Sequence, residues 1–160
     1  MAFEVTIDDR AVVAAFTKAP ALITSAMHRA VELGSADFEG SVIALTPVGA
    51  TGQLRASITH DVSGSGIMVT GRTYSTDVPI KTASVETGRA PGRMPPAAPL
   101  ELWVSRKLGI SDPGVVYLIR RAIGRRGTKG AGMFAKGYRD GLPRVTARVN
   151  ELMSVVRRVL

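Results

Sequence analysis

Residues 19–52 read APALITSAMHRAVELGSADFEGSVIALTPVGATG, and the change of pattern inside this stretch decides the fold. Up to Leu45 the apolar residues recur at three- and four-residue intervals, which is the period of an amphipathic helix. Pro20 falls where the first turn of a helix tolerates proline, and Pro47 ends the helix because proline has no backbone N–H. The sequence therefore predicts one long helix over residues 18–46.

Beyond this helix, glycines separate short β-rich runs, and residues 47–88 are predicted to form a small sheet. Two of the runs, Ser57–Val62 and Ile67–Thr73, flank Ser63-Gly64-Ser65-Gly66, a tetrapeptide typical of a hairpin turn. A third run, Val78–Val85, contains a proline and is therefore expected at an edge or at the start of a strand. We predict an α+β fold, with the long N-terminal helix packed on an antiparallel sheet of three or four strands.

The rest of the chain is predicted to be helical and rich in basic residues, over residues 100–160. It follows a loop at residues 89–99 that holds four prolines. Ser111-Asp112-Pro113 is a helix start, since aspartate caps a helix and proline suits its first turn. A second helix precedes it at Leu100–Leu108, and a third has apolar residues three and four apart from Leu142 to Val159.

These segments together predict a single domain over residues 1–160, with residues 1–17 as an N-terminal arm. Glycines at Gly127–Gly132 predict a second loop. We expect the loops Arg89–Pro99 and Arg125–Gly132 to be exposed and mobile in the isolated subunit, because their backbones lack regular hydrogen-bond partners.

The charge is distributed unevenly along the chain. Residues 1–100 carry 8 Lys/Arg and 9 Asp/Glu, whereas residues 101–160 carry 13 Lys/Arg and 4 Asp/Glu. The net charge of +8 therefore arises from the last 60 residues. This asymmetry predicts a polyanionic neighbour or an acidic protein face, and the alternative is that the charge only solvates helix surfaces.

Several kinds of chemistry lack the residues that they require. The chain has no cysteine and only two histidines, His28 and His60, which excludes disulfides and an ordinary zinc site. Gly127–Gly132 does not match a phosphate-binding loop, and no G-x-S-x-G nucleophile elbow is present. We expect no enzymatic activity, no cofactor and no metal.

No apolar run is long enough to span a membrane, and the acidic start is unlike a signal peptide. These two features favour a protein made and kept in a cytoplasm, or in a particle assembled there.

Three segments resemble the tail-completion and head–tail joining proteins of long-tailed bacteriophages. TPVGATGQLRASI at residues 46–58 resembles the family pattern P-V-D-T-G-x-L-R-x-S-I, although Gly49 and Ala50 stand where the family often has aspartate. VETG at residues 85–88 is similar to the family's V-E-x-G, and RMPPAAPLELW at residues 93–103 follows in the family's order. The residues that match these motifs are Pro47, Thr51, Gly52, Leu54, Arg55, Glu86, Gly88, Pro95, Pro96 and Trp103. Without the resemblance, the same residues indicate turns that set the fold, and Trp103 indicates a core anchor.

The resemblance implies a structural virion protein of the phage neck or tail, assembled in the host cytoplasm. It would be a ring component that completes the tail and joins it to the head around the DNA channel, next to other neck and tail proteins. We expect a closed homo-oligomeric ring, hexameric rather than dodecameric, because heterologous contacts that do not close produce filaments. The alternative is a sequence-independent nucleic-acid-binding protein, against which only 5% of the residues are aromatic and available for base stacking. The residues expected to face the lumen or the next ring are Arg120, Arg121, Arg125, Arg126 and Lys129.

Overall fold

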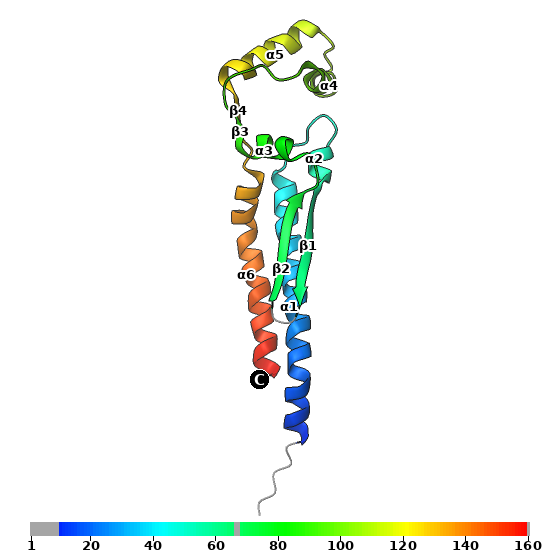
Figure 1. The fold of residues 1–160 in the computed structure, drawn as a ribbon, viewed down its shortest axis with the longest axis vertical. Coiled ribbons are helices and arrows are strands. Elements are labelled where there is room, and N and C mark those ends of the chain that lie inside the picture. The colour runs from blue at the N-terminus through cyan, green and yellow to red at the C-terminus, as the bar shows by residue number, and fades with distance from the viewer. Residues whose placement is uncertain (1–9, 66–67, 160) are drawn as a thin grey trace, which may run out of the picture.

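The computed structural model describes residues 10–65 and 68–159, which form an elongated molecule (Figure 1). Two long helices, α1 (Arg10–Leu45) and α6 (Met133–Val159), run antiparallel side by side along its length. A hairpin of β1 (Ile58–Ser65) and β2 (Met68–Ser75) lies along α1. The α+β fold with a long N-terminal helix, a small antiparallel sheet and C-terminal helices is confirmed.

Helix α1 begins earlier than predicted, at Arg10, so residues 10–17 are helical and do not form an arm. Residues 1–9 of the expected arm lie outside the described residues. Pro20 is consequently inside the helix and not in its first turn. The flanking residues are rich in alanine, the strongest helix former, which offsets the hydrogen bond that proline cannot donate. The end of the helix at Leu45, before Pro47, is confirmed.

The two strands of the hairpin pair residue for residue from Ile58↔Ser75 to Ser65↔Met68. Three residues of the predicted turn, 63–65, therefore belong to β1, because the two strands continue to pair beyond the first glycine. The remaining turn residue Gly66, and Ile67 of the second predicted run, lie outside the described residues. Gly71 packs directly on α1, since a Cβ atom there would lie 2.0 Å from the Ser35 Oγ.

The prediction of a third strand at Val78–Val85 is wrong, because Pro79–Thr87 forms helix α3. Pro79 occupies the first helical position, where its fixed φ and its missing N–H are both compatible with a helix. Further along α3, a side-chain hydroxyl group donates a hydrogen bond to a backbone carbonyl one turn earlier. Ser84 Oγ donates to the Ile80 carbonyl oxygen at 2.7 Å. Among residues 10–65 and 68–159, the main sheet therefore has two strands and not three or four.

The hydrophobic core lies where α1, the short helix α2 (Gln53–Ala56), β1 and the start of α6 meet. Helices α1 and α6 approach closely at Gly137, where an added Cβ would lie 3.1 Å from the Val42 Cα. Further along the pair, Arg148 Nε lies 3.0 Å from an Asp37 carboxylate oxygen. The buried residues of this core are Val42, Leu54, Ile58 and Met133.

His60 connects the hairpin to α1 through two carboxylates. Its Nδ1 hydrogen-bonds Glu39, and its Nε2 lies 3.2 Å from the Glu32 Oε1. The hydrogen bond to Glu39 raises the pKa of His60, and Glu32 adds to this effect against an opposing contribution from burial. A protonated His60 therefore stabilises the contact between β1 and α1.

We expect this contact to make stability depend on pH between about pH 5 and about pH 8. Because the folded-state pKa is raised, the stabilisation is fully present below the unfolded-state pKa and is lost as pH rises through the folded-state pKa. The free energy of unfolding of wild type and of His60→Gln, measured with urea across this range, should differ most at the acidic end. A difference that stays constant or grows with pH would contradict the assigned role of His60.

Candidate functional site

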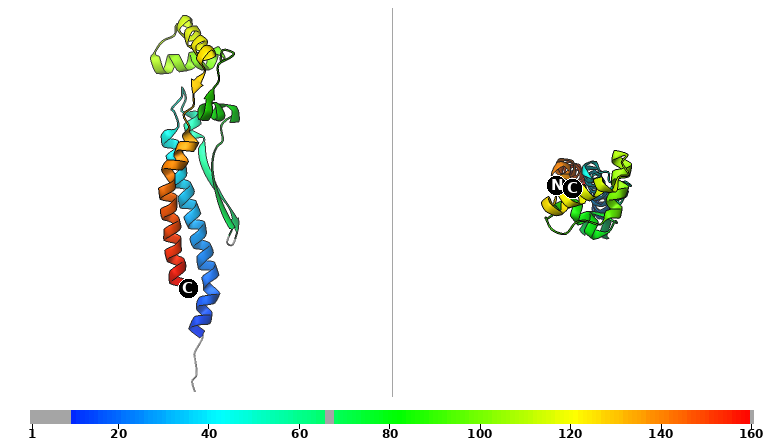
Figure 2. Two further views of the ribbon diagram at one scale, coloured as in Figure 1. Left: turned by 90° about the vertical axis from the view of Figure 1, so that its left-hand side faces the viewer. Right: turned by 90° about the horizontal axis from the view of Figure 1, so that it is seen from above.

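Two short segments join the helical pair α4 (Ala97–Leu108) and α5 (Pro113–Arg126) to the rest of the molecule. They pair as an antiparallel ribbon of β3 (Gly88–Arg89) and β4 (Thr128–Lys129) (Figure 1). We call residues 88–132 the head, and the described residues outside this range the body. The head lies at the end of the molecule opposite the C-terminal end of α6 (Figure 2).

The ribbon requires glycine at both of its segments. Gly88 and Gly127 have φ values of +84° and +70°, and a Cβ on either would lie within 2.2 Å of a backbone oxygen of the opposite segment. Gly130 is equally confined, because a Cβ there would lie 2.3 Å from the Glu86 carbonyl oxygen. The ribbon continues into the body, where Ala131 N donates to the Val85 oxygen at 2.7 Å.

These contacts correct part of the expectation for the two loops, namely that their backbones lack regular hydrogen-bond partners. The loop predicted at residues 89–99 also ends earlier, at Pro96, because Ala97–Pro99 belong to α4. The backbone of Arg125 and Arg126 belongs to α5, and Thr128–Lys129 pairs with Gly88–Arg89, so these residues have regular partners. Neither composition nor spacing could reveal this pairing, because it joins segments about 40 residues apart. The side chains of Thr128 and Lys129 are exposed, as predicted.

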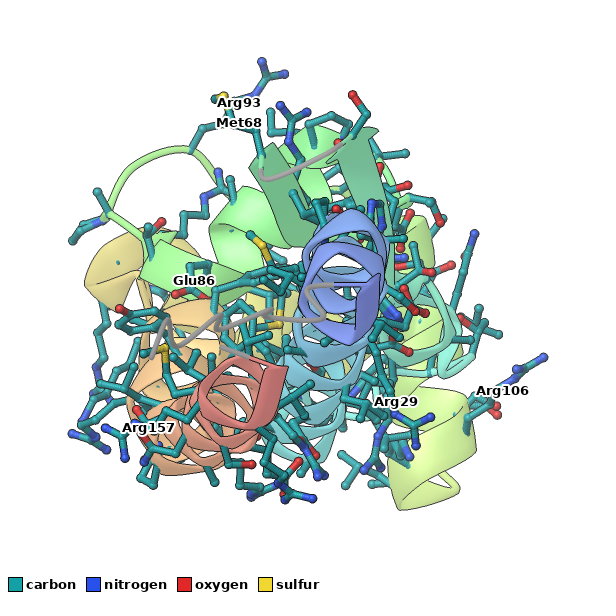
Figure 3. The ribbon with its side chains drawn as sticks, turned by 90° about the horizontal axis from the view of Figure 1, so that it is seen from below. Arg29, Met68, Glu86, Arg93, Arg106 and Arg157 are labelled. Carbon is teal, nitrogen blue, oxygen red and sulfur yellow. The ribbon has the colours of Figure 1, made fainter. Side chains whose placement is uncertain are left out.

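Glu86, from the family-like VETG segment, caps helix α6. Its two carboxylate oxygens accept hydrogen bonds from Phe134 N at 2.9 Å and Ala135 N at 3.1 Å. A carboxylate is stabilising at this position, because the first amides of a helix have no partner within the helix and carry a partial positive charge. Glu86 lies inside the outline of the molecule, whereas Arg93, Arg106 and Arg157 project away from it (Figure 3). The VETG segment thus connects the ribbon to the start of α6.

The first and third family-like segments meet across a cleft between body and head. The cleft has a volume of about 680 Å³, and Pro47 and Leu54 of the body face Trp103 of α4 across it. Arg106 Nη1 donates to the Ala50 carbonyl oxygen at 3.2 Å and bridges the two sides. Trp103 is half-buried and lines this cleft, so it is not an anchor of the main core.

The other motif residues have local structural roles. Thr51 Oγ1 accepts a hydrogen bond from Gln53 N at 3.3 Å, a contact typical of a side chain that caps a turn. Gly52 has a φ of +70° and precedes α2, and Arg55 is half-buried within α2. Pro96 directly precedes α4, in the N-cap position.

The head carries most of the net charge of the protein. Residues 88–132 contain nine Lys/Arg and two Asp/Glu, a net charge of +7 out of the +8 of the whole chain. The exposed side of α5 presents Tyr117 and Leu118 among the basic side chains. None of the ion pairs within the described residues involves the exposed basic residues Arg121, Arg125, Arg126 and Lys129.

Arg120 differs from the other members of the predicted cluster. Its side chain is half-buried, and its Nε donates to the Pro95 carbonyl oxygen at 2.8 Å. This hydrogen bond attaches the proline-rich segment to α5, as does Gly92 N, which donates to the Gly124 oxygen at 2.7 Å. The structure therefore places Arg120 in the packing of the head and leaves the other four side chains on its surface.

Within residues 10–65 and 68–159, no group of three or more His, Asp or Glu side chains is arranged to bind a metal ion. In the same residues, no helix is both long and apolar enough to cross a membrane. No family model matches the chain, and neither a curated protein nor a solved structure shows significant similarity to it.

Proposed function

We propose that this chain is a structural virion protein of the phage neck or tail. It would form a ring that completes the tail and joins it to the head around the DNA channel. The observation that carries this proposal is the meeting of the three family-like segments at one place, the junction of body and head. Pro47 and Trp103 face each other across the cleft, and Glu86 holds the start of α6 beside the ribbon.

The shape and the charge support the same proposal. A slender body with a strongly basic end suits a subunit that stands beside its neighbours and directs positive charge at a channel or at the next ring. Arg121, Arg125, Arg126 and Lys129 supply that charge, and they are exposed. In this proposal the partners are copies of the same chain, the adjoining neck and tail proteins, and genome DNA through non-specific contacts.

The second candidate function is sequence-independent nucleic-acid binding by a free protein. The observation that favours it is the net charge of +7 on the head, where Tyr117 of α5 is 49% exposed and available for base stacking. The two functions differ in the requirement for a ring, since a free binding protein needs no closed assembly.

Disruption of the gene in the phage that carries it tests the proposed function. We expect DNA-filled heads and separate tails, because the joining ring would be missing, and we expect a plasmid copy of the wild-type gene to restore complete particles. Electron micrographs of the lysate give the readout. Complete, infectious particles from the disrupted phage would contradict the assignment to the neck or tail.

A further inference from the structure

We propose that the subunits of this ring join through their hairpins, with strand β1 of one copy pairing with strand β2 of the next. The inference rests on the proposed ring and names the surface that builds it. Among the described residues, the hairpin is a two-stranded sheet with no third strand on either side. Both outer edges therefore present backbone N–H and C=O groups along eight residues.

These edges lack most of the features that usually prevent a strand from pairing with another chain. Proteins protect an exposed edge with a proline, a bulge, a very short strand, a covering element or charged side chains, lysine above all. The two strands contain no lysine, and their charged residues Asp61 and Arg72 have opposite signs. The strands contain no proline, and their register runs without a bulge from Ile58↔Ser75 to Ser65↔Met68. A two-stranded sheet is marginal by itself, so addition of strands at its edges would stabilise it.

The β2 edge is accessible because α6 does not cover it. An apolar groove of about 380 Å³ separates them, with Gly71 and Thr73 of β2 on one side and Leu142 and Val145 of α6 on another. The inner face of the hairpin packs on α1, and α3 contacts β2 only near its C-terminal end, where Thr82 Oγ1 donates to the Ser75 Oγ at 3.2 Å. A strand from another copy can thus reach β2 without displacing a helix.

The charges on the two edges select a second copy of this chain as the occupant. Asp61 of β1 and Arg72 of β2 are directly opposed in the hairpin register, and both are exposed. In a closed ring, neighbouring copies are related by a rotation with no translation along the axis. In a ring whose strands run nearly parallel to the ring axis, Asp61 of one copy would lie beside Arg72 of the next copy. Ser63 would lie beside Thr70 in the same way. The strands would also be antiparallel across the contact, as they are within the hairpin.

Cysteine cross-linking tests this contact without background, because the wild-type chain contains no cysteine. Chains carrying Ser63→Cys are mixed with chains carrying Thr70→Cys, the assembly is oxidised, and covalent dimers are measured on a denaturing gel. We expect dimers from the mixture and not from either variant alone. Ser105→Cys, an exposed position on α4, mixed with Thr70→Cys is the matched control and should give none.

The outcomes separate this inference from the proposed function. Further cysteine pairs can be placed at residues 61 and 72 and at residues 59 and 74, which are also opposed in the register. Rings of normal size in which none of the three cysteine pairs forms a disulfide between chains would overturn the hairpin contact and leave the ring proposal intact. Monomers at all protein concentrations would overturn both.

Charge reversal gives an independent test. Asp61→Lys alone and Arg72→Glu alone should each lose the ring, because every contact between copies then joins like charges. An equal mixture of the two variants should recover it, since each contact between unlike chains again joins opposite charges. Within every chain of the mixture the two positions still carry like charges, so an effect confined to the hairpin itself cannot produce the recovery. Rings from both single variants, or no recovery in the mixture, would overturn the proposal.

Discussion

A chain carrying Gly130→Val is expected to lose the packing of the ribbon on the body, with a loss of about 3 kcal/mol or more in the free energy of unfolding. The valine Cβ would lie 2.3 Å from the Glu86 carbonyl oxygen and 2.5 Å from the Thr87 carbonyl carbon. Both are backbone atoms, so no rotation of a side chain relieves the overlap. Urea unfolding followed by circular dichroism measures the change.

Gly40→Ala is the matched control for this variant. Gly40 lies inside α1, and a Cβ there has no atom within 4 Å. The alanine should increase stability by up to about 1 kcal/mol, because alanine favours the helix more than glycine does. Equal stability of Gly130→Val and wild type would show that the ribbon does not hold head and body together in the described way.

Replacement of Arg121, Arg125 and Arg126 by serine is expected to change interactions of the head without unfolding it. All three side chains are exposed, and Arg120, which binds the Pro95 carbonyl, is left in place. If the head contacts DNA, the slope of log K against log salt should become shallower by about 2.7, since each lost phosphate contact removes about 0.9. Fluorescence anisotropy with duplexes of unrelated sequence measures this slope.

A variant with Arg144, Arg157 and Arg158 replaced by serine is the matched control. It loses three positive charges, as the head variant does, but from exposed positions on α6 away from the head. Its DNA affinity should stay much closer to that of wild type than the affinity of the head variant does. If the head instead contacts an acidic protein ring, the head variant should keep its DNA affinity and fail to join heads to tails. Unchanged DNA binding together with normal infectious particles would reduce the cluster to ordinary surface charge.

The parts of the fold predicted correctly are those that depend on local sequence. The end of α1 before Pro47 follows from the proline itself, and the start of α5 follows from Asp112, whose carboxylate accepts a hydrogen bond from Gly114 N at 2.7 Å. The prediction of a strand in place of α3 was wrong because the β-branched residues there are typical of a strand, whereas Pro79 at the first helical position is the local signal for a helix.

The parts that could not be predicted depend on contacts between distant segments. The glycines of the ribbon indicated loops, because each segment contains only half of a pair that forms in the folded chain. Arg120 could not be distinguished from Arg121 by composition, since only the position of the Pro95 carbonyl separates their roles. The motif residues of the candidate site were identified from the sequence, but their meeting around one cleft required the tertiary structure.

Negative-stain imaging of the purified full-length protein, with native mass spectrometry of the same sample, tests the central proposal most directly. We expect closed rings with a whole-number multiple of the 16.9 kDa subunit mass, six copies in preference to twelve. Because copies in such a ring are related by rotation alone, their basic heads should all lie on one face. Monomers across the concentration range, or open filaments in place of rings, would contradict the proposed role as a joining ring between head and tail.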